Sequence, residues 1–324
     1  MPNDVPTGSQ TPMPQTTEDE TQRWKTLDAA SYDDVADQFA LISERLSSGA
    51  ARRLLELAAP RSGDRVLDVG TGAGLLPFAL LGSAPDVALV TGVDISSGMV
   101  ATARRRAREA GRDEQRVRFE TMDAEQLAFG DGAFDVVVSA FALTHVPRPE
   151  VALREIHRVL RPGGRVAIAL GSRPALLSVD TLTHGVRDAR RRLESALGRR
   201  LTTDLLDRIV EHELGPAEHD LPRGSRLSRD QNRAVLLSEL VRDAGFQSVS
   251  RSWRNYQNEV ATADEFWEIH RTIRSDARKR LLHASPEEIA RIRALFMERC
   301  RRTTERGGVL AFPISAVFVV AEKR

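Results

Sequence analysis

The sequence has little cysteine, little lysine and no long apolar segment. Cys300 is the only cysteine among 324 residues, which excludes an intrachain disulfide and a metal cluster built from cysteines. A single thiol suits a reducing compartment, and we predict a cytoplasmic location. No apolar run reaches the length of a membrane span, and the N-terminus shows no apolar signal core. We therefore expect no membrane-spanning segment.

Neither sign of charge is in excess. The 47 basic and 46 acidic side chains leave a net charge of +1, and only three of the basic residues are lysines. A balance of this kind provides no field that would attract nucleic acid or an anionic membrane, so neither is expected as a partner. Apolar residues make up 41% of the chain, which is enough for a buried core. A homodimer is left open.

Strands and helices alternate through the middle of the chain. Residues 1–20 have almost no apolar side chains and are predicted to be a disordered tail. Apolar residues at helical spacing predict a helix over 31–59. Short apolar segments then predict strands at 65–70, 88–94, 117–123, 134–141 and 165–170, and further strands at 248–256 and 314–323. Strand–helix units of this length predict a doubly wound, mostly parallel α/β sheet of seven strands.

The domain organisation follows from where this alternation stops. Residues 21–171 are expected to hold the N-terminal helices and most of the sheet. Residues 172–227 are expected to form a helical insertion, with its clearest helix at 184–198. Residues 228–324 would complete the sheet, with a second helical insertion at about 262–306. That insertion opens its second helix with Ser285, Pro286 and Glu288, a capping box with proline in the first turn.

The segment Val66–Gly74, VLDVGTGAG, joins a predicted strand to a predicted helix. Its three glycines allow the backbone to turn sharply and to approach a ligand closely, although an ordinary strand-to-helix turn has a similar composition. A dinucleotide-binding turn would place its third glycine at the position of Leu75. Asp68 precedes the turn by two residues. An acid there disfavours a phosphate and favours a ligand with an ammonium or sulfonium charge.

Acidic residues end two further strands. Asp94 ends the second strand, 24 residues after Gly70, where nucleoside-binding α/β proteins place a carboxylate that accepts the ribose hydroxyls. Asp123 ends the third strand, where a carboxylate could accept the exocyclic amine of an adenine. Each acid alone could be an ordinary loop residue, and the combination with the glycine turn favours a nucleoside ligand.

Residues of about 60–170 resemble the class I S-adenosylmethionine (SAM)-dependent methyltransferases, and within them the group that includes the ubiquinone and menaquinone biosynthesis enzymes. Four blocks carry the resemblance in the right order: VLDVGTGAG, VTGVDISSGMVATAR, MDAEQLAFGDGAFDVVVSAFALTHV and EIHRVLRPGGRVAIA. They cover about a third of the chain. They imply a Rossmann-like fold, SAM as the cofactor and methyl transfer as the activity, and they say little about the acceptor.

The resemblance also implies which residues contact SAM. The methionine part of SAM would be held by Gly70, Thr71, Gly72 and Gly74, with Asp68 nearby, and its ribose would be bound by Asp94. The adenine would be contacted by Ile95, Met99, Asp123 and Ala124. The methyl group would be bordered by Ser139, Ala140 and Phe141, and Tyr32 would fold over the cofactor. Core packing is the alternative role for Met99 and Phe141.

Two departures from related groups narrow the chemistry. The segment SAFALTHV follows the fourth strand, where methyltransferases that act on amide or nucleobase nitrogens carry an NPPY-type segment. Methylation of DNA, RNA bases or glutamine is therefore not expected. The sequence also lacks a clear acidic set of the kind that holds magnesium in the catechol-type enzymes, and no metal site is predicted.

The regions outside the motifs are left to form the acceptor pocket. These are residues 172–227 as a cap and the helical pair at about 262–306, with the N-terminal helix as a lid. Their bulk indicates an enclosed site for a small or medium organic molecule. The resemblance implies that this molecule is of quinone or secondary-metabolite type and is methylated on oxygen, carbon or nitrogen. Trp253, Tyr256, Phe266 and Trp267 are candidates to line this pocket, and core packing is the alternative for each of them.

His145 is the candidate base. It follows the fourth strand, at the rim where the methyl group should emerge, and histidine titrates near neutral pH. The alternative is a structural histidine that holds the loop before Pro147. His184 and Tyr256 are the next candidates for the base.

Three other functions stay open. A SAM-binding protein of the same fold could catalyse a non-methylating reaction such as a cyclisation. The protein could also be a binding or regulatory module without catalytic activity, but the intact site residues argue against this. An NAD-dependent oxidoreductase would use a similar fold, against which the glycine spacing speaks.

Overall fold

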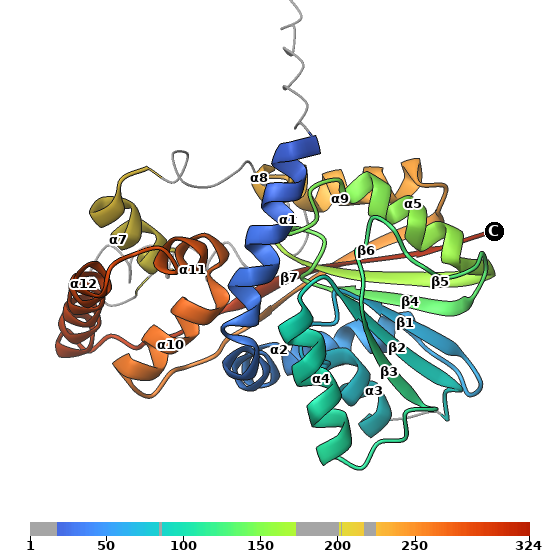
Figure 1. The fold of residues 1–324 in the computed structure, drawn as a ribbon, viewed down its shortest axis with the longest axis horizontal. Helices are drawn as coiled ribbons and strands as arrows, with labels where there is room; N and C mark the ends of the chain where they lie inside the picture. Colours follow the sequence, from blue (N-terminus) through green and yellow to red (C-terminus); the bar gives the residue numbers. More distant parts are fainter. Residues whose placement is uncertain (1–17, 84–85, 173–200, 202, 217–224) are drawn as a thin grey trace, which may run out of the picture.

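The computed structural model describes residues 18–83, 86–172, 201, 203–216 and 225–324, and its centre is one seven-stranded sheet (Figure 1). The strands are β1 (Arg65–Val69), β2 (Leu89–Asp94), β3 (Val117–Thr121), β4 (Phe134–Ala140), β5 (Leu160–Gly171), β6 (Gln247–Tyr256) and β7 (Ile314–Glu322). Their order across the sheet is β3-β2-β1-β4-β5-β7-β6. The five predicted strands of the first half are thus confirmed, with ends that differ by a few residues.

The sheet is mostly parallel, as predicted. β1 to β5 pair in parallel, because a helix returns the chain across the sheet between most of them. β7 is antiparallel to both of its neighbours, β5 and β6. The carboxyl ends of β1, β2 and β4 therefore meet along one edge, next to the point at which the strand order reverses. Ligands of open α/β sheets bind at such a point.

Helices cover both faces of the sheet. α2 (Ala36–Ala58), α3 (Leu75–Ser83) and α4 (Ser97–Glu109) pack on one face, and α5 (Pro149–Val159) and α9 (Arg233–Asp243), preceded by the short α8 (Arg226–Arg229), pack on the other. The central strands are buried on both faces, which explains their continuous apolar sequences. Two hydrophobic cores result, one on each face of the sheet.

A group of helices lies beside the sheet and shares a third core. It consists of α7 (Leu205–Leu214), α10 (Ala263–Ile273), α11 (Ser275–Leu281) and α12 (Pro286–Glu305), which pack around Phe266 and Phe296. In Figure 1 these helices stand to the left and the sheet to the right, with α1 (Glu18–Asp33) upright between them. The predicted capping box is present, because Ser285 and Glu288 each bond to the backbone N–H of the other.

Three expectations differ from the structure. The helix predicted over 31–59 is two helices, α1 and α2, and α1 begins at Glu18, inside the segment predicted as a tail. The first helix of the 262–306 insertion is broken at Arg274, whose extended conformation ends α10 and begins α11. The helix predicted at 184–198 and His184 lie outside the described residues, so the 172–227 insertion stays a prediction. None of the described helices is long and apolar enough to cross a membrane.

Candidate functional site

A cavity of about 350 Å³ opens at the carboxyl ends of β1, β2 and β4. Helices α1 and α2 form one wall, and the segments around Ile273 and Phe312 from the neighbouring helical region form another. The structure brings most of the predicted site residues together on its lining: Tyr32, Asp68, Gly70, Thr71, Gly72, Asp94, Ile95, Met99, Asp123, Ala124, Ala140, Phe141 and His145. Segments far apart in the sequence thus converge on one space.

Two of the predicted residues do not reach this lining. Ser139 is fully buried in β4 and its hydroxyl donates a hydrogen bond to the carbonyl of Val69, so it ties two strands together. Gly74 has φ of +89° and faces Phe78 and Phe119, where an added Cβ would lie 2.6 Å from the Phe78 ring. Both residues therefore support the turn from the side of the protein core and do not face the cavity.

The glycine turn is held by the acid that ends β2. Oδ2 of Asp94 accepts a hydrogen bond of 2.8 Å from the backbone N–H of Gly72, and Oδ1 accepts one of 3.0 Å from Ser96. Burial raises the pKa of Asp94, and these two backbone donors oppose that shift. Gly72 has φ of +52°, and Gly70 has φ of +75° with an added Cβ only 2.1 Å from Ala142. Both positions therefore need glycine.

Asp68 is a buried carboxyl group that faces the cavity. Its side chain is 1% exposed, and Oδ1 has no hydrogen-bond partner within the described part of the chain. Burial raises the pKa of Asp68 to about 7, and the nearby carboxylate of Asp94 adds to the shift. An unpaired buried acid is costly in the free protein, and a cationic group in the cavity would relieve that cost.

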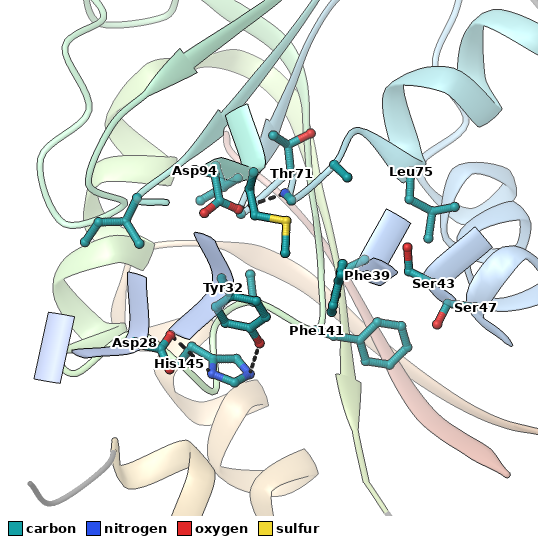
Figure 2. A pocket seen from close by; sticks show the side chains of 18 of the residues that line it. Asp28, Tyr32, Phe39, Ser43, Ser47, Thr71, Leu75, Asp94, Phe141 and His145 are labelled. Carbon is teal, nitrogen blue, oxygen red and sulfur yellow. Dashed lines mark hydrogen bonds and ion pairs between the residues drawn. The ribbon is translucent and has the colours of Figure 1, made fainter. Parts of the chain in front are cut away.

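Aromatic and sulfur-containing side chains border the same space. Met99 is 2% exposed and packs with Tyr32 and Phe39 on small residues of α2, so part of its role is packing. Tyr32 and Phe39 meet edge to face at 5.5 Å. Phe141 follows β4 with φ of +61°, which is unusual for a residue with a side chain and turns the ring along the cavity wall (Figure 2).

Asp123 has partners that the sequence did not indicate. Lys25 of α1 lies 2.7 Å from its Oδ2 and 2.6 Å from Glu125, and the same glutamate pairs with Arg148. The other oxygen of Asp123 accepts a hydrogen bond from the backbone of Glu125. This network attaches α1 to the loop after β3. Each oxygen of Asp123 keeps one lone pair after these contacts, so the proposed hydrogen bond to the amine of an adenine stays possible.

His145 lies between two residues of α1. Oδ2 of Asp28 lies 3.5 Å from Nδ1 of His145, and the hydroxyl of Tyr32 lies 3.4 Å from Nε2 (Figure 2). The Nε1–H of Trp24 donates to the carbonyl of His145 at 2.8 Å. Burial raises the pKa of Tyr32 to about 12, so its hydroxyl stays protonated. Asp28 was missed from the sequence, and its spacing of four from Trp24 and Tyr32 is the signal that could have identified it.

The rest of the cavity wall is largely apolar. Phe39, Ser43 and Ser47 follow each other along one face of α2, with Phe141 near them in Figure 2. Residues of the β7 side, Phe312 and Ile314 among them, complete this wall. None of these except Phe141 was predicted.

The four aromatic residues predicted to line the pocket are all absent from its lining. Trp253 packs in the core beneath α9, and Phe266 and Trp267 pack in the core of the helical group. Tyr256 lies against Gly49, where an added Cβ would be 2.8 Å from its ring. The alternative role of core packing is therefore correct, and Tyr256 is removed as a candidate base.

Comparison with known proteins finds similarity in the central segment of the chain. Residues 67–168 match the family model described as a methyltransferase domain. The chain is 40% identical over 141 residues to a demethylmenaquinone methyltransferase of Thermus thermophilus, across 42% of this chain and 62% of that protein. It is 29% identical over 239 residues to a ubiquinone/menaquinone biosynthesis C-methyltransferase of Paracoccus denitrificans, across 72% and 88%.

A third relative is named for a different substrate. The chain is 41% identical over 140 residues to a 27-O-demethylrifamycin SV methyltransferase of Amycolatopsis mediterranei, across 42% of this chain and 50% of that protein. The matches to the Thermus and Amycolatopsis proteins thus span only about half to three fifths of those relatives. Among solved structures, the YcgJ protein of Bacillus subtilis is similar in fold, with a TM-score of 0.51, 23% identity and coverage of 85% of this chain and 98% of that one.

Proposed function

We propose that this protein is a class I, SAM-dependent methyltransferase close to the ubiquinone/menaquinone group and that it transfers a methyl group from SAM to a small, uncharged organic molecule. The match of residues 67–168 to a methyltransferase domain and the similarity to the relatives above support this proposal. The observation that carries the proposal is one cavity with two unlike ends. Its glycine-turn end has one buried carboxyl group with an unsatisfied oxygen, that of Asp68, which suits a cation, and its other end is apolar with His145 at the rim.

The residues at the glycine turn fit SAM. The unpaired Oδ1 of Asp68 suits the ammonium group of the methionine part, and the backbone of Gly70 and Gly72 leaves room that a side chain would fill. Asp94 keeps lone pairs for both ribose hydroxyls while it holds the turn. Ile95 lies on the same lining and suits the adenine. The dinucleotide position is taken by Leu75 on the lining, which speaks against NAD.

SAM supplies, when bound, a methyl group already activated by its positive sulfur. The protein mainly has to hold the acceptor in line with that methyl group, and such alignment is worth about 7–11 kcal/mol. The apolar wall with Phe39, Phe141 and Phe312 holds an apolar ring and excludes water from the transfer. The hydroxyl of Ser47 is available to orient polar substituents of the acceptor, and that of Ser43, which donates to the carbonyl of Ala40, can still accept a hydrogen bond from them.

The charged groups around the cavity favour an uncharged acceptor. Lys25 is paired with Asp123 and Glu125, and Arg274 is paired with Asp207 at 2.6 Å. Both cationic side chains among the described lining residues therefore already have anionic partners. A phosphate or carboxylate on the acceptor would have to displace one of these partners, at a desolvation cost.

His145 is proposed as the base. Methylation of a hydroxyl or of an acidic carbon releases a proton, and the relatives include both a C-methyltransferase and an enzyme named for an O-demethyl substrate. The Nε2 atom of His145 lies at the cavity rim beside Tyr32 and is placed to take that proton. We expect His145→Ala to reduce turnover by about 10²–10⁴-fold with nearly unchanged SAM affinity.

A matched variant separates this role from a structural one. His212 is 80% exposed and lies outside the cavity, so His212→Gln should change neither turnover nor binding. If His145→Ala turns over like the wild type between pH 6 and 9, His145 is not the base. If it instead weakens SAM binding and stability with a small loss in turnover, it is a structural residue.

The proposed function is tested in two steps. Calorimetry on the purified chain should show binding of SAM and of S-adenosylhomocysteine, without competition from NAD or ATP. Incubation with SAM and a panel of simple phenols, a naphthohydroquinone and hydroxylated polyketides should then release S-adenosylhomocysteine and give a methylated product. NAD binding without a SAM signal would overturn the proposal.

The non-methylating alternative predicts a different result, namely conversion of an acceptor while SAM stays intact. The matching family model and the relatives named above are all methyltransferases, and they do not favour that alternative.

A further inference from the structure

Three residues on one face of α1 surround His145. Trp24, Asp28 and Tyr32 are spaced by four residues and therefore share a helix face. Trp24 bonds to the backbone of His145, Asp28 faces Nδ1 and Tyr32 faces Nε2, so each polar atom of this histidine's ring and its carbonyl meets α1. The orientation of the imidazole is thus determined by a helix far from it in the sequence.

Asp28 is itself held from the other side by α11. Nζ of Lys279 lies 2.6 Å from Oδ1 of Asp28, and the Lys279 side chain is 0% exposed. The same Nζ lies 3.6 Å from the centre of the Trp24 ring, in a cation–π contact. Burial alone raises the pKa of Asp28, but His145 and Lys279 together outweigh it and hold that pKa well below its usual range. Asp28 is therefore ionised at neutral pH.

A second contact fixes the Tyr32 side of the arrangement. The guanidinium of Arg278 lies 3.8 Å from the centre of the Tyr32 ring and donates a hydrogen bond of 2.6 Å to the carbonyl of Thr272. Two adjacent residues of α11, Arg278 and Lys279, thus contact the two aromatic residues of the α1 face. The break at Arg274 sets the direction of α11 and brings both cations to α1.

We propose that Asp28, fixed by Lys279, is a positioning residue that accepts the Nδ1–H of His145 and thereby keeps Nε2, which faces the Tyr32 hydroxyl on the cavity lining, unprotonated. This inference rests on the proposed function, in which His145 takes the acceptor's proton. In that step the methyl carbon exchanges its bond to sulfur for a bond to the acceptor, and the acceptor's proton moves to Nε2. The positive charge thereby passes from the sulfur to the imidazole ring, which lies next to the Asp28 carboxylate.

The ion pair between Asp28 and Lys279 carries a desolvation cost that is not needed to hold α1 in place. Burying two charges requires their desolvation, and an apolar pair would hold two helices together equally well. α1 is already attached to the sheet domain through Lys25, Asp123 and Glu125. The feature that an apolar pair could not provide is a fixed negative charge 3.5 Å from Nδ1.

The tautomer of His145 tests the proposal without any acceptor. Nitrogen-15 NMR of the full chain above neutral pH reports which ring nitrogen carries the proton, and His145→Gln identifies the resonance. We expect Nδ1–H in the wild type and a shift to Nε2–H in the double variant Asp28→Leu/Lys279→Met, which removes both charges together. An unchanged tautomer in a folded double variant overturns the proposal.

A single substitution keeps the test decisive if the double variant does not fold. Asp28→Asn retains the shape and removes the charge, and we expect turnover with the best acceptor of the phenol and hydroquinone panel to fall at least about tenfold, with SAM affinity unchanged. Wild-type turnover in Asp28→Asn overturns the proposal. Glu18→Gln removes an exposed α1 ion pair with Arg148 and should alter neither the tautomer nor turnover.

The two proposals fail in different ways. If the tautomer shifts as expected but no acceptor of the panel is methylated, the positioning role of Asp28 stands and the proposed function is in error. If methylation occurs and the tautomer does not depend on Asp28, the positioning role is in error.

Discussion

Asp94 and Gly72 are joined by a hydrogen bond of 2.8 Å from the backbone N–H of the glycine to Oδ2 of the carboxylate. The bond links the end of β2 to the turn after β1, so the acid expected to bind ribose also holds the turn on which the methionine part of SAM would rest. Loss of this side chain should therefore affect the cofactor twice, through the ribose contacts and through the position of the turn.

We expect Asp94→Ala to weaken SAM binding by at least about 100-fold, because two charge-assisted hydrogen bonds worth about 1.5–3 kcal/mol each are removed. Circular dichroism should show an intact fold. Calorimetry measures the affinity, and Asp131→Ala, which alters an exposed acid paired with Arg158, serves as the control. Wild-type affinity in Asp94→Ala would move the ribose site elsewhere.

Binding of the cofactor should release a proton from Asp68. The pKa of about 7 means that this carboxyl is mostly protonated at pH 6, and the ammonium group of S-adenosylhomocysteine favours its ionised form. Affinity should therefore rise with pH, by about tenfold per unit below pH 7, and level off above it. The ligand's amine is already charged at pH 6, so it does not contribute to the proton count.

Calorimetry at pH 6 in buffers of different ionisation enthalpy counts the released protons. We expect nearly one proton per ligand for the wild type and none for Asp68→Asn. The same proton release in both proteins would assign the titration to another group.

The glycine turn should be sensitive to size as well as to backbone conformation. Gly63 and Gly70 both have a left-handed φ, of +82° and +75°, but an added Cβ has open space at Gly63 and lies 2.1 Å from Ala142 at Gly70. Gly63→Ala should cost about 1–2 kcal/mol of unfolding free energy from backbone strain alone. Gly70→Ala should cost about 1–3 kcal/mol more and abolish SAM binding. Urea denaturation measures both, and equal costs would show that Ala142 moves aside.

His270 should make the protein sensitive to mild acid. Its ring is 0% exposed among Phe266, Phe296 and Phe312, and neither ring nitrogen has a hydrogen-bond partner among the described residues. Burial lowers the pKa of His270 to about 3, whereas the unfolded chain binds this proton near pH 6.5. The unfolded state therefore gains stability as pH falls below 6.5.

Between pH 7 and 5 this linkage should cost about 2 kcal/mol of unfolding free energy. His270→Phe fills similar space without a titratable group and should flatten the pH dependence in this window. Denaturant unfolding at pH 5 and pH 7 compares the two proteins. An equal loss in His270→Phe would show that other groups cause it.

Local sequence patterns predicted the elements of the sheet well. Strands such as Phe134–Ala140 are buried on both faces, and their continuous apolar runs are visible without any partner. The glycine turn and Asp94 follow strands whose carboxyl ends meet by topology, so their proximity could be expected before the structure was known. The position of β7 between β5 and β6 had no comparable local signal, since it depends on which strand edges remain to be covered.

Periodicity and turn glycines act over a few residues, and for that reason they were enough to predict the α/β class, the succession of strands and the residues that line the glycine-turn end of the cavity. The other end of the cavity depends on contacts between distant segments, which the folded chain alone brings together. The bounds of α1 escaped prediction because much of its buried face is polar, with Thr21, Lys25, Asp28 and Ser31 among the buried residues. Such side chains can be buried only when distant charges and hydrogen-bond partners satisfy them, and Lys279, the partner of Asp28, is brought there by the fold alone.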